Sequence, residues 1–118
     1  MTTQELLDMD MSKRKNKDII CKILHKVEPV QIQHSYEGEM SLKVLEKALL
    51  EMCAQYSYGV QTIYPYFEEK QFRFYTASVI KKTDTTIWCG NVYGKTMWEI
   101  FAKLIIKIYS EIKREKSK

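Results

Sequence analysis

The chain has 118 residues, of which 45% are hydrophobic and 12% aromatic, and a formal net charge of +4 at pH 7. This composition excludes a disordered chain, and the length suits one domain whose core needs neither disulfides nor a structural metal. No apolar run approaches the roughly 20 residues that span a bilayer, so we expect no membrane contact. Residues 1–17 lack the apolar segment of a secretory signal. Three scattered cysteines suit a reducing compartment, and we therefore expect a cytoplasmic protein.

The first part of the chain predicts two helices and a linker. A Thr–Glu pair with capping-box spacing predicts a helical turn over Thr3–Met9. Apolar residues at helical spacing predict a second helix over Asn16–Val27, which Pro29 ends. Gln31–Met40 has no periodicity and contains a glycine, so it is interpreted as a linker. Residues 1–40 are therefore expected to form a helical extension and linker.

A helix followed by three strands is predicted in the middle of the chain. Ser41 is the expected N-cap of the helix, and Gly59 is expected to end it in a left-handed conformation. The apolar period then changes from 3.6 to 2, and β-branched and aromatic residues become frequent. Short connections predict antiparallel hairpins, with Pro65 placing the first strand at an edge or on a bulge. The three predicted strands are Val60–Phe67, Gln71–Ile80 and Thr85–Tyr93.

The last helix is predicted over residues 96–114 and should contribute most to the core. Thr96 and Glu99 have capping-box spacing, and apolar side chains cover well over a third of the helix surface. This arc is too wide for one sheet face, so we expect the helix to lie on the sheet with its flank against another helix or a subunit. Residues that could form a subunit interface, most simply in a symmetric homodimer, are Trp98, Ile106 and Tyr109.

These elements predict an α+β fold: a three-stranded antiparallel sheet with two helices on one face, in the order αβββα, plus the N-terminal helical extension. Residues 41–118 form this αβββα core, and the whole chain is expected to be one domain.

The turn into the last helix reads Gly94-Lys95-Thr96-Met97-Trp98-Glu99. This turn and the predicted element order over about residues 41–113 together resemble the double-stranded-RNA-binding domain. That family contacts phosphates through a Lys-Lys-x-Ala-Lys cluster at this place, where the present chain has one lysine. The resemblance implies the fold, and the missing lysines remove the family's means of binding RNA. The chain is also vaguely similar to small uncharacterised proteins of phages of Gram-positive bacteria.

Two sequence patterns come close to known chemical sites. Gly90–Thr96 is one residue short of a phosphate-binding P-loop, and its valine and tyrosine are unsuited to wrapping phosphates. Anion binding at Lys95 and Thr96 and a plain turn with a helix cap remain as interpretations. Cys21 and His25 are four residues apart on a helix, but zinc needs four ligands. No nucleophile set can be assembled, so we expect no enzyme, no cofactor and no metal.

Basic clusters are the remaining candidates for a binding site. Three bases of the last helix fall within about 40° of one another at 100° per residue. Together with strand aromatics they could bind single-stranded nucleic acid by stacking, although such aromatics are more often core residues. The candidate nucleic-acid or anion contacts are Lys13, Arg14, Lys15, Lys17, Lys95, Thr96, Lys103, Lys107 and Arg114.

The expected function is therefore binding without catalysis, with a protein or a second copy of the chain as partner. Abundant Lys, Ile, Tyr and Asn suggest an AT-rich genome, such as that of a low-GC bacterium or its phages. In that setting such a protein would occlude or sequester a host factor, for example one of a defence system. The alternative is a nucleic-acid-binding protein that uses the basic N-terminal arm and the basic face of the last helix.

Overall fold

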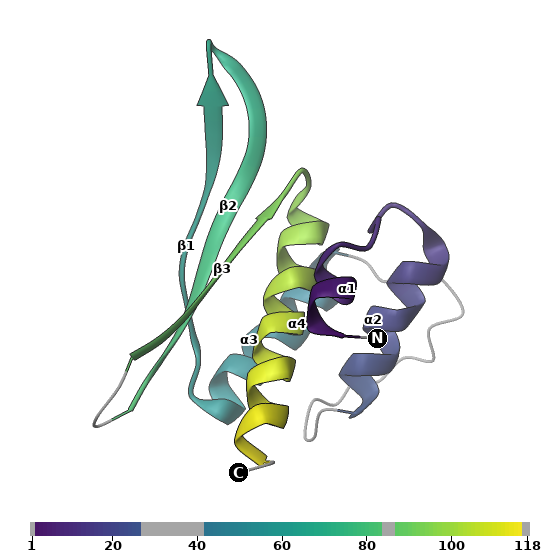
Figure 1. Ribbon diagram of the computed structural model, residues 1–118, viewed down its shortest axis with the longest axis vertical. Coiled ribbons are helices and arrows are strands. Elements are labelled where there is room, and N and C mark those ends of the chain that lie inside the picture. Colours follow the sequence, from purple (N-terminus) through teal and green to yellow (C-terminus); the bar gives the residue numbers. More distant parts are fainter. Residues whose placement is uncertain (1, 27–41, 84–86, 117–118) are drawn as a thin grey trace.

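The computed structural model describes residues 2–26, 42–83 and 87–116, and it confirms the predicted α+β fold (Figure 1). The predicted linker, the stop at Pro29, the Ser41 cap and the boundary at residues 40 and 41 lie outside the described residues. The elements are α1 (Thr3–Leu7), α2 (Arg14–Lys26), α3 (Leu42–Tyr56), β1 (Gly59–Glu68), β2 (Gln71–Lys82), β3 (Ile87–Gly94) and α4 (Met97–Lys116).

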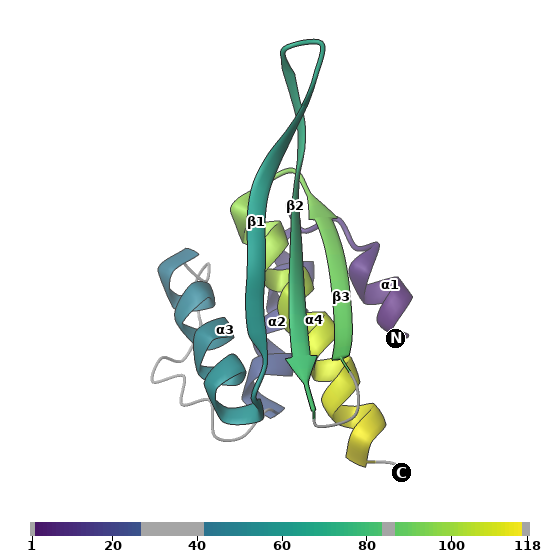
Figure 2. The same ribbon diagram turned by 90° about the vertical axis from the view of Figure 1, so that its left-hand side faces the viewer.

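The sheet is an antiparallel meander in the order β1-β2-β3, so β1 and β3 are its edges. Pro65 lies in the edge strand β1, as its missing N–H predicts. The β1–β2 register shifts between Val60 and Thr62 and between Tyr66 and Phe67, which marks two bulges. Figures 1 and 2 show the described helices on one side of the sheet. The opposite side therefore carries no described helix.

Helix α4 is the centre of the core. It packs across β2 and β3, lies beside α3, and is covered on its far side by α1 and α2 (Figure 1). Because neighbours surround it, it buries apolar residues around most of its circumference, and each large aliphatic or aromatic side chain contributes about 1.5–3 kcal/mol. The buried apolar residues of α4 are Ile100, Phe101, Ala102, Leu104, Ile105, Ile106, Ile108 and Ile112. The predicted contact of this helix with both a sheet and another helix is confirmed.

The end of α3 differs from the prediction. Ser57, not Gly59, takes the left-handed conformation, with φ 63°. The N–H of Tyr58 donates to the carbonyl oxygen of Cys53 at 2.9 Å, which is the long hydrogen bond of a Schellman cap. Gly59 is the first residue of β1. The left-handed position depends on where the last helical turn ends, and a serine can adopt this conformation. The prediction for Gly59 is therefore wrong.

The capping box at the start of α4 is only half as predicted. The N–H of Glu99 donates to Oγ1 of Thr96 at 3.2 Å, as expected of an N-cap. The Glu99 carboxylate instead accepts the N–H of Lys95 at 2.7 Å, one residue before the cap. Both reciprocal hydrogen bonds of a capping box form at α1, between Thr2 and Glu5.

Candidate functional site

The predicted basic face of α4 is largely occupied by contacts within the fold. Nζ of Lys103 donates to the carbonyl oxygen of Tyr93 at 2.5 Å and lies 3.3 Å from Oε1 of Glu99. Nε of Arg114 lies 3.0 Å from both carboxylate oxygens of the buried Glu111. These hydrogen bonds raise the pKa of the Arg114 guanidinium. Lys107, which is half-buried, is the one base of the three without such a contact to a carboxylate or a carbonyl oxygen of the described residues. The basic face therefore does not present three free positive charges to a nucleic acid.

The basic run Lys13–Lys17 leads into a helix and is not an extended arm. Oδ1 of Asp10 accepts the N–H of Ser12 at 3.0 Å and its hydroxyl at 2.6 Å, which places the chain to begin α2 at Arg14. Hydrogen bonding by Ser12 lowers the pKa of Asp10. Helix α2 therefore begins two residues earlier than predicted, with Lys13, Arg14 and Lys15 exposed.

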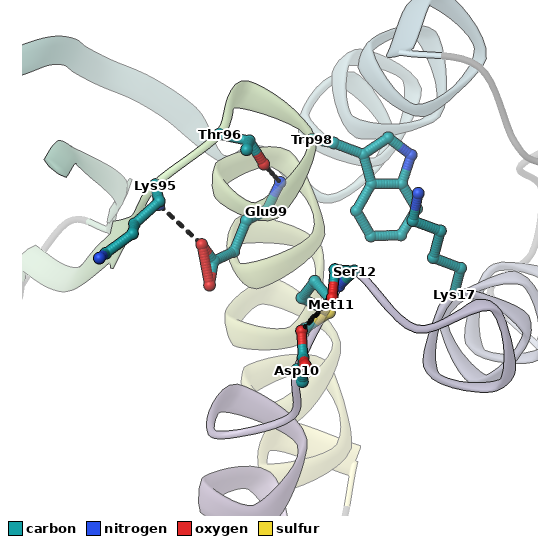
Figure 3. Close-up of a pocket in the computed structure, with 8 residues that line it drawn as sticks. All are labelled: Asp10, Met11, Ser12, Lys17, Lys95, Thr96, Trp98 and Glu99. Atoms are coloured by element: carbon teal, nitrogen blue, oxygen red, sulfur yellow. Dashed lines mark hydrogen bonds between the residues drawn. The ribbon is translucent and has the colours of Figure 1, made fainter.

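A hollow of about 590 Å³ brings four predicted site residues together from the two ends of the chain (Figure 3). Nζ of Lys17 lies 5.0 Å from the ring centroid of Trp98, at cation–π distance. Lys95 and Thr96 lie at the same rim, and Figure 3 shows Lys95 directed away from the indole. Asp10 and Glu99 also line the hollow, so its two acids balance its two lysines. The hollow is thus neutral, with an aromatic wall.

The predicted interface residues on α4 are covered by the chain's own N-terminal helices. Ile106 is 0% exposed, so in this fold it offers no surface to a partner. Trp98 and Tyr109 are half-buried, and Tyr109 lines a second hollow beneath α1 and α2. The hydroxyls of Thr3 and Ser110 are 2.8 Å apart and tie α1 to α4. The wide apolar arc of α4 is therefore satisfied within the chain.

The most prominent exposed apolar feature is the distal part of the β1–β2 hairpin, residues 65–75, which we call the hairpin arm. The last β3 residue, Gly94, pairs with Tyr75, so the ladder beyond this point has only two strands. Figures 1 and 2 show the arm projecting past the end of β3 and beyond the helices. A two-stranded ribbon has little core of its own, so its side chains remain in solvent.

Aromatic rings cover both faces of the hairpin arm. On the side away from the helices, Tyr66 stacks on Phe74 with ring centroids 5.0 Å apart. Pairing jumps from Phe74 to Phe72, which leaves Arg73 on a bulge and turns Phe72 to the helix side. There the Phe72 ring lies 4.9 Å from Tyr75 and 6.1 Å from Phe67. The bulge therefore creates two aromatic clusters from one short sequence.

The rings on the helix side are accessible, and the arm carries no net charge. Phe67 is 57% exposed and Phe72 is 42% exposed. The charged residues nearest to these rings are two acids and two bases: Glu68, Glu69, Lys70 and Arg73. Arg73 lies 3.8 Å from Glu68, so one acid and one base already pair. Large exposed apolar surface with little charge is typical of sites that bind other proteins.

The tip of the arm is held in an unfavourable backbone conformation. Glu69 and Lys70 form a two-residue turn in which φ is 52° and 65°. Positive φ at both positions is a type I′ turn, which normally uses Asn-Gly because side chains disfavour this region. Such strain is found most often at functional sites.

Sequence reasoning assigned these aromatics chiefly to the core and did not identify the arm. The signal that could have identified the arm is the number of aromatic residues on both sides of a two-residue connection. Only every second side chain of a strand points to the buried face, so some of these rings must point away from the core. The rings of the hairpin arm are Tyr66, Phe67, Phe72, Phe74 and Tyr75.

The other candidate chemistry does not assemble in the described part of the chain. Residues 90–94 belong to β3, so the segment resembling a P-loop is mostly strand. Cys21 and Cys53 are buried, which raises the pKa of both thiols, whereas Cys89 is exposed. No group of three His, Cys, Asp or Glu side chains suitable for a metal forms among the residues with described positions. Within the same ranges, every helix is too short or too polar to cross a bilayer.

No family model, no curated protein and no solved structure matches this chain. The structure shows the element order itself, in which α3, the three strands and α4 follow the two N-terminal helices.

Proposed function

We propose that this chain is a non-enzymatic binding protein that recognises another protein through the helix side and tip of its hairpin arm. The observation that carries the proposal is the exposure of Phe67 and Phe72 on a ribbon that projects beyond the domain. Aromatic side chains that enter a partner's pocket are common energetic centres of interfaces. The arm presents such side chains at the farthest point from its own core.

Preorganisation of the arm supports this role. Ring contacts at 4.9 Å and 6.1 Å join Phe72 to Tyr75 and Phe67, and Tyr75 is itself packed against the core. The exposed rings are therefore already restricted before a partner arrives. Binding then requires less loss of side-chain entropy, which favours affinity.

The charge balance of the arm favours a protein over a nucleic acid. Proteins that stack on nucleic-acid bases combine aromatics with cations that follow the phosphates. The arm has two acids for its two bases, and Arg73 is near Glu68. A neutral aromatic surface suits an apolar pocket on a protein instead. If the chain comes from a phage or mobile element, as its composition suggests, the partner would be a host factor that the arm occludes.

Site-specific photocrosslinking tests the proposal. A photoreactive phenylalanine analogue replaces Phe67 in cells of the source organism, and the control carries it at Leu50, which is 54% exposed on α3. We expect a discrete protein adduct from position 67 alone. The purified partner should then bind the Phe67→Ser/Phe72→Ser variant at least about 30-fold more weakly, as expected for loss of a 2 kcal/mol hot spot. Crosslinking from both positions alike, or unchanged affinity of the double variant, contradicts the proposal.

Nucleic-acid binding is the second candidate, and one observation favours it. Lys17, at cation–π distance from the Trp98 ring, and Lys95 both line the hollow, and Lys13 and Lys15 of the same basic run as Lys17 are exposed. A gel shift with single- and double-stranded probes separates the two candidates. Nucleic-acid binding must weaken steeply as salt rises and must be lost in a Lys13/Lys15/Lys17 triple alanine variant. Protein binding through the arm should change little with salt and should survive that variant.

A further inference from the structure

The side of the sheet that faces away from the helices, which we call the outer face, is a second uncovered surface. Alternation along the strands assigns its residues: Ala77, Val79 and Val92 are buried toward the helices, so their strand neighbours point outward. Figures 1 and 2 show no described element on this side. The outer face runs from Tyr64 and Tyr93 near the arm to Ile87 at the opposite end of β3.

The outer face exposes an area comparable to one side of a stable interface. Tyr64 is 53%, Tyr93 57% and Ile87 68% exposed, and Tyr66 and Phe74 continue the surface. With about 150–250 Å² per aromatic side chain, the half-exposed rings alone present roughly 300–400 Å². The residues between them bring the total toward the approximately 800 Å² per partner of a standard interface. An apolar patch of this size is often an interaction site.

Charge is confined to one end of the outer face. Among the outward positions of residues 62–66, 74–82 and 87–93, Lys82 alone is charged, and it lies at the end of β2. A nucleic acid needs several cations along its path, which this surface lacks. In a symmetric dimer the two-fold axis places the outer face against the same face of the second copy. Because this face carries so little charge, the contact does not bring rows of like charges together.

Two hydroxyls at the centre of the outer face, those of Thr62 and Ser78, are already paired. Oγ1 of Thr62 and Oγ of Ser78 are 3.3 Å apart, and Ser78 Oγ also lies 3.5 Å from Oε1 of Gln61. Ser78 is buried even without a covering layer. Burial of these two hydroxyls beneath a second molecule therefore leaves neither of them without a partner, which lowers the usual penalty for covering a polar sheet face.

We propose that a second copy of this chain packs on the outer face, sheet against sheet about a two-fold axis. The dimer goes beyond the proposed arm function, because Phe67 and Phe72 lie on the other side of the ribbon and remain free to bind a partner. It replaces the predicted dimer through α4, whose apolar arc the N-terminal helices cover.

Sedimentation velocity of the full chain tests the dimer. We expect a concentration-dependent dimer that dissociates at about micromolar or lower concentration, as interfaces of standard size do. Tyr93→Arg places two arginines in the two-fold contact and should weaken association at least tenfold with an unchanged circular dichroism spectrum. Leu50→Arg, equally exposed on α3, and the Phe67→Ser/Phe72→Ser arm variant should both associate like the wild type.

Protection of Cys89 provides an independent measurement. This thiol lies exposed on the outer face, while Cys21 and Cys53 are buried. Its alkylation rate should fall severalfold between dilute and concentrated wild-type protein and should stay constant in Tyr93→Arg. A wild type that sediments as a monomer at every concentration overturns the proposal. So does an unaffected dimer in the Tyr64→Arg/Tyr93→Arg double variant, or protection of Cys89 by a different protein only. None of these outcomes alters the crosslinking result at Phe67.

Discussion

Gly94 and Glu99 share one space where β3 passes into α4. A Cβ on Gly94 would lie 2.9 Å from Oε2 of Glu99, the oxygen that accepts the N–H of Lys95 at 2.7 Å. The glycine leaves room for the carboxylate, which folds back over it. Its φ is not in the left-handed region, so the contact with Glu99, not the backbone conformation, favours glycine here.

Gly94→Ala is therefore expected to displace the Glu99 side chain and break its hydrogen bond to Lys95. The side chain is flexible and moves aside, so the free energy of unfolding should fall by only about 1 kcal/mol, the net value of one hydrogen bond. Urea unfolding of a double-mutant cycle checks this. In a Glu99→Ala background, Gly94→Ala should have almost no effect, and additive effects of the two changes would refute the steric coupling.

Ile106→Ala is expected to destabilise the monomer. The side chain is fully buried between the layers of the domain, so its truncation leaves a cavity and should lower the free energy of unfolding by about 2–5 kcal/mol. Chemical denaturation with and without dilution measures the change. An effect on association alone, with unchanged stability at low protein concentration, would instead restore Ile106 to a subunit interface.

Lys70→Gly is expected to stabilise the tip of the hairpin arm. Lys70 has a φ of 65°, and a non-glycine residue in this region carries roughly 1–2 kcal/mol of strain that glycine relieves. Hydrogen exchange of the amides in residues 65–75 should slow, while α4 is unaffected. Lys70→Ala is the matched control, since it removes the same charge and keeps the strain. Equal protection in both variants would show that charge, not backbone strain, governs the arm.

Acid should loosen α1 before the rest of the domain. Hydrogen bonds from Thr2 lower the pKa of Glu5 from its ordinary value of 4.5. The charged form is thus favoured in the fold, and its stabilisation is complete above about pH 4.5 and lost as the pH falls through the lowered value. NMR titration should show amides of residues 3–7 shifting in this range. Glu5→Gln should remove the dependence, and an unchanged titration in that variant would assign it to another group.

The local structure followed closely from sequence, because caps and periodicity act over a few residues. The change of period after α3, the edge position of Pro65 and the caps at Thr2 and Thr96 were all predicted correctly. Predictions failed where the outcome depended on a shift of one or two residues at a helix end. Ser57 rather than Gly59 takes the left-handed conformation that follows α3, and the N–H of Lys95 rather than that of Thr96 donates to the Glu99 carboxylate.

The sequence by itself therefore determined which segments are helix and strand and that α4 had more apolar surface than one sheet can bury. Only the tertiary structure decided what covers that surface. Helices α1 and α2 pack on α4, where Ile106 is fully buried, whereas the rings of the hairpin arm and the outer face remain in solvent. The physical reason is that periodicity reports the apolar faces of an element but not its neighbours. For the strands, the neighbours depend on the strand register and on the end of β3 at Gly94, beyond which the β1–β2 ribbon has no third strand beside it. Both features arise from contacts between distant parts of the chain.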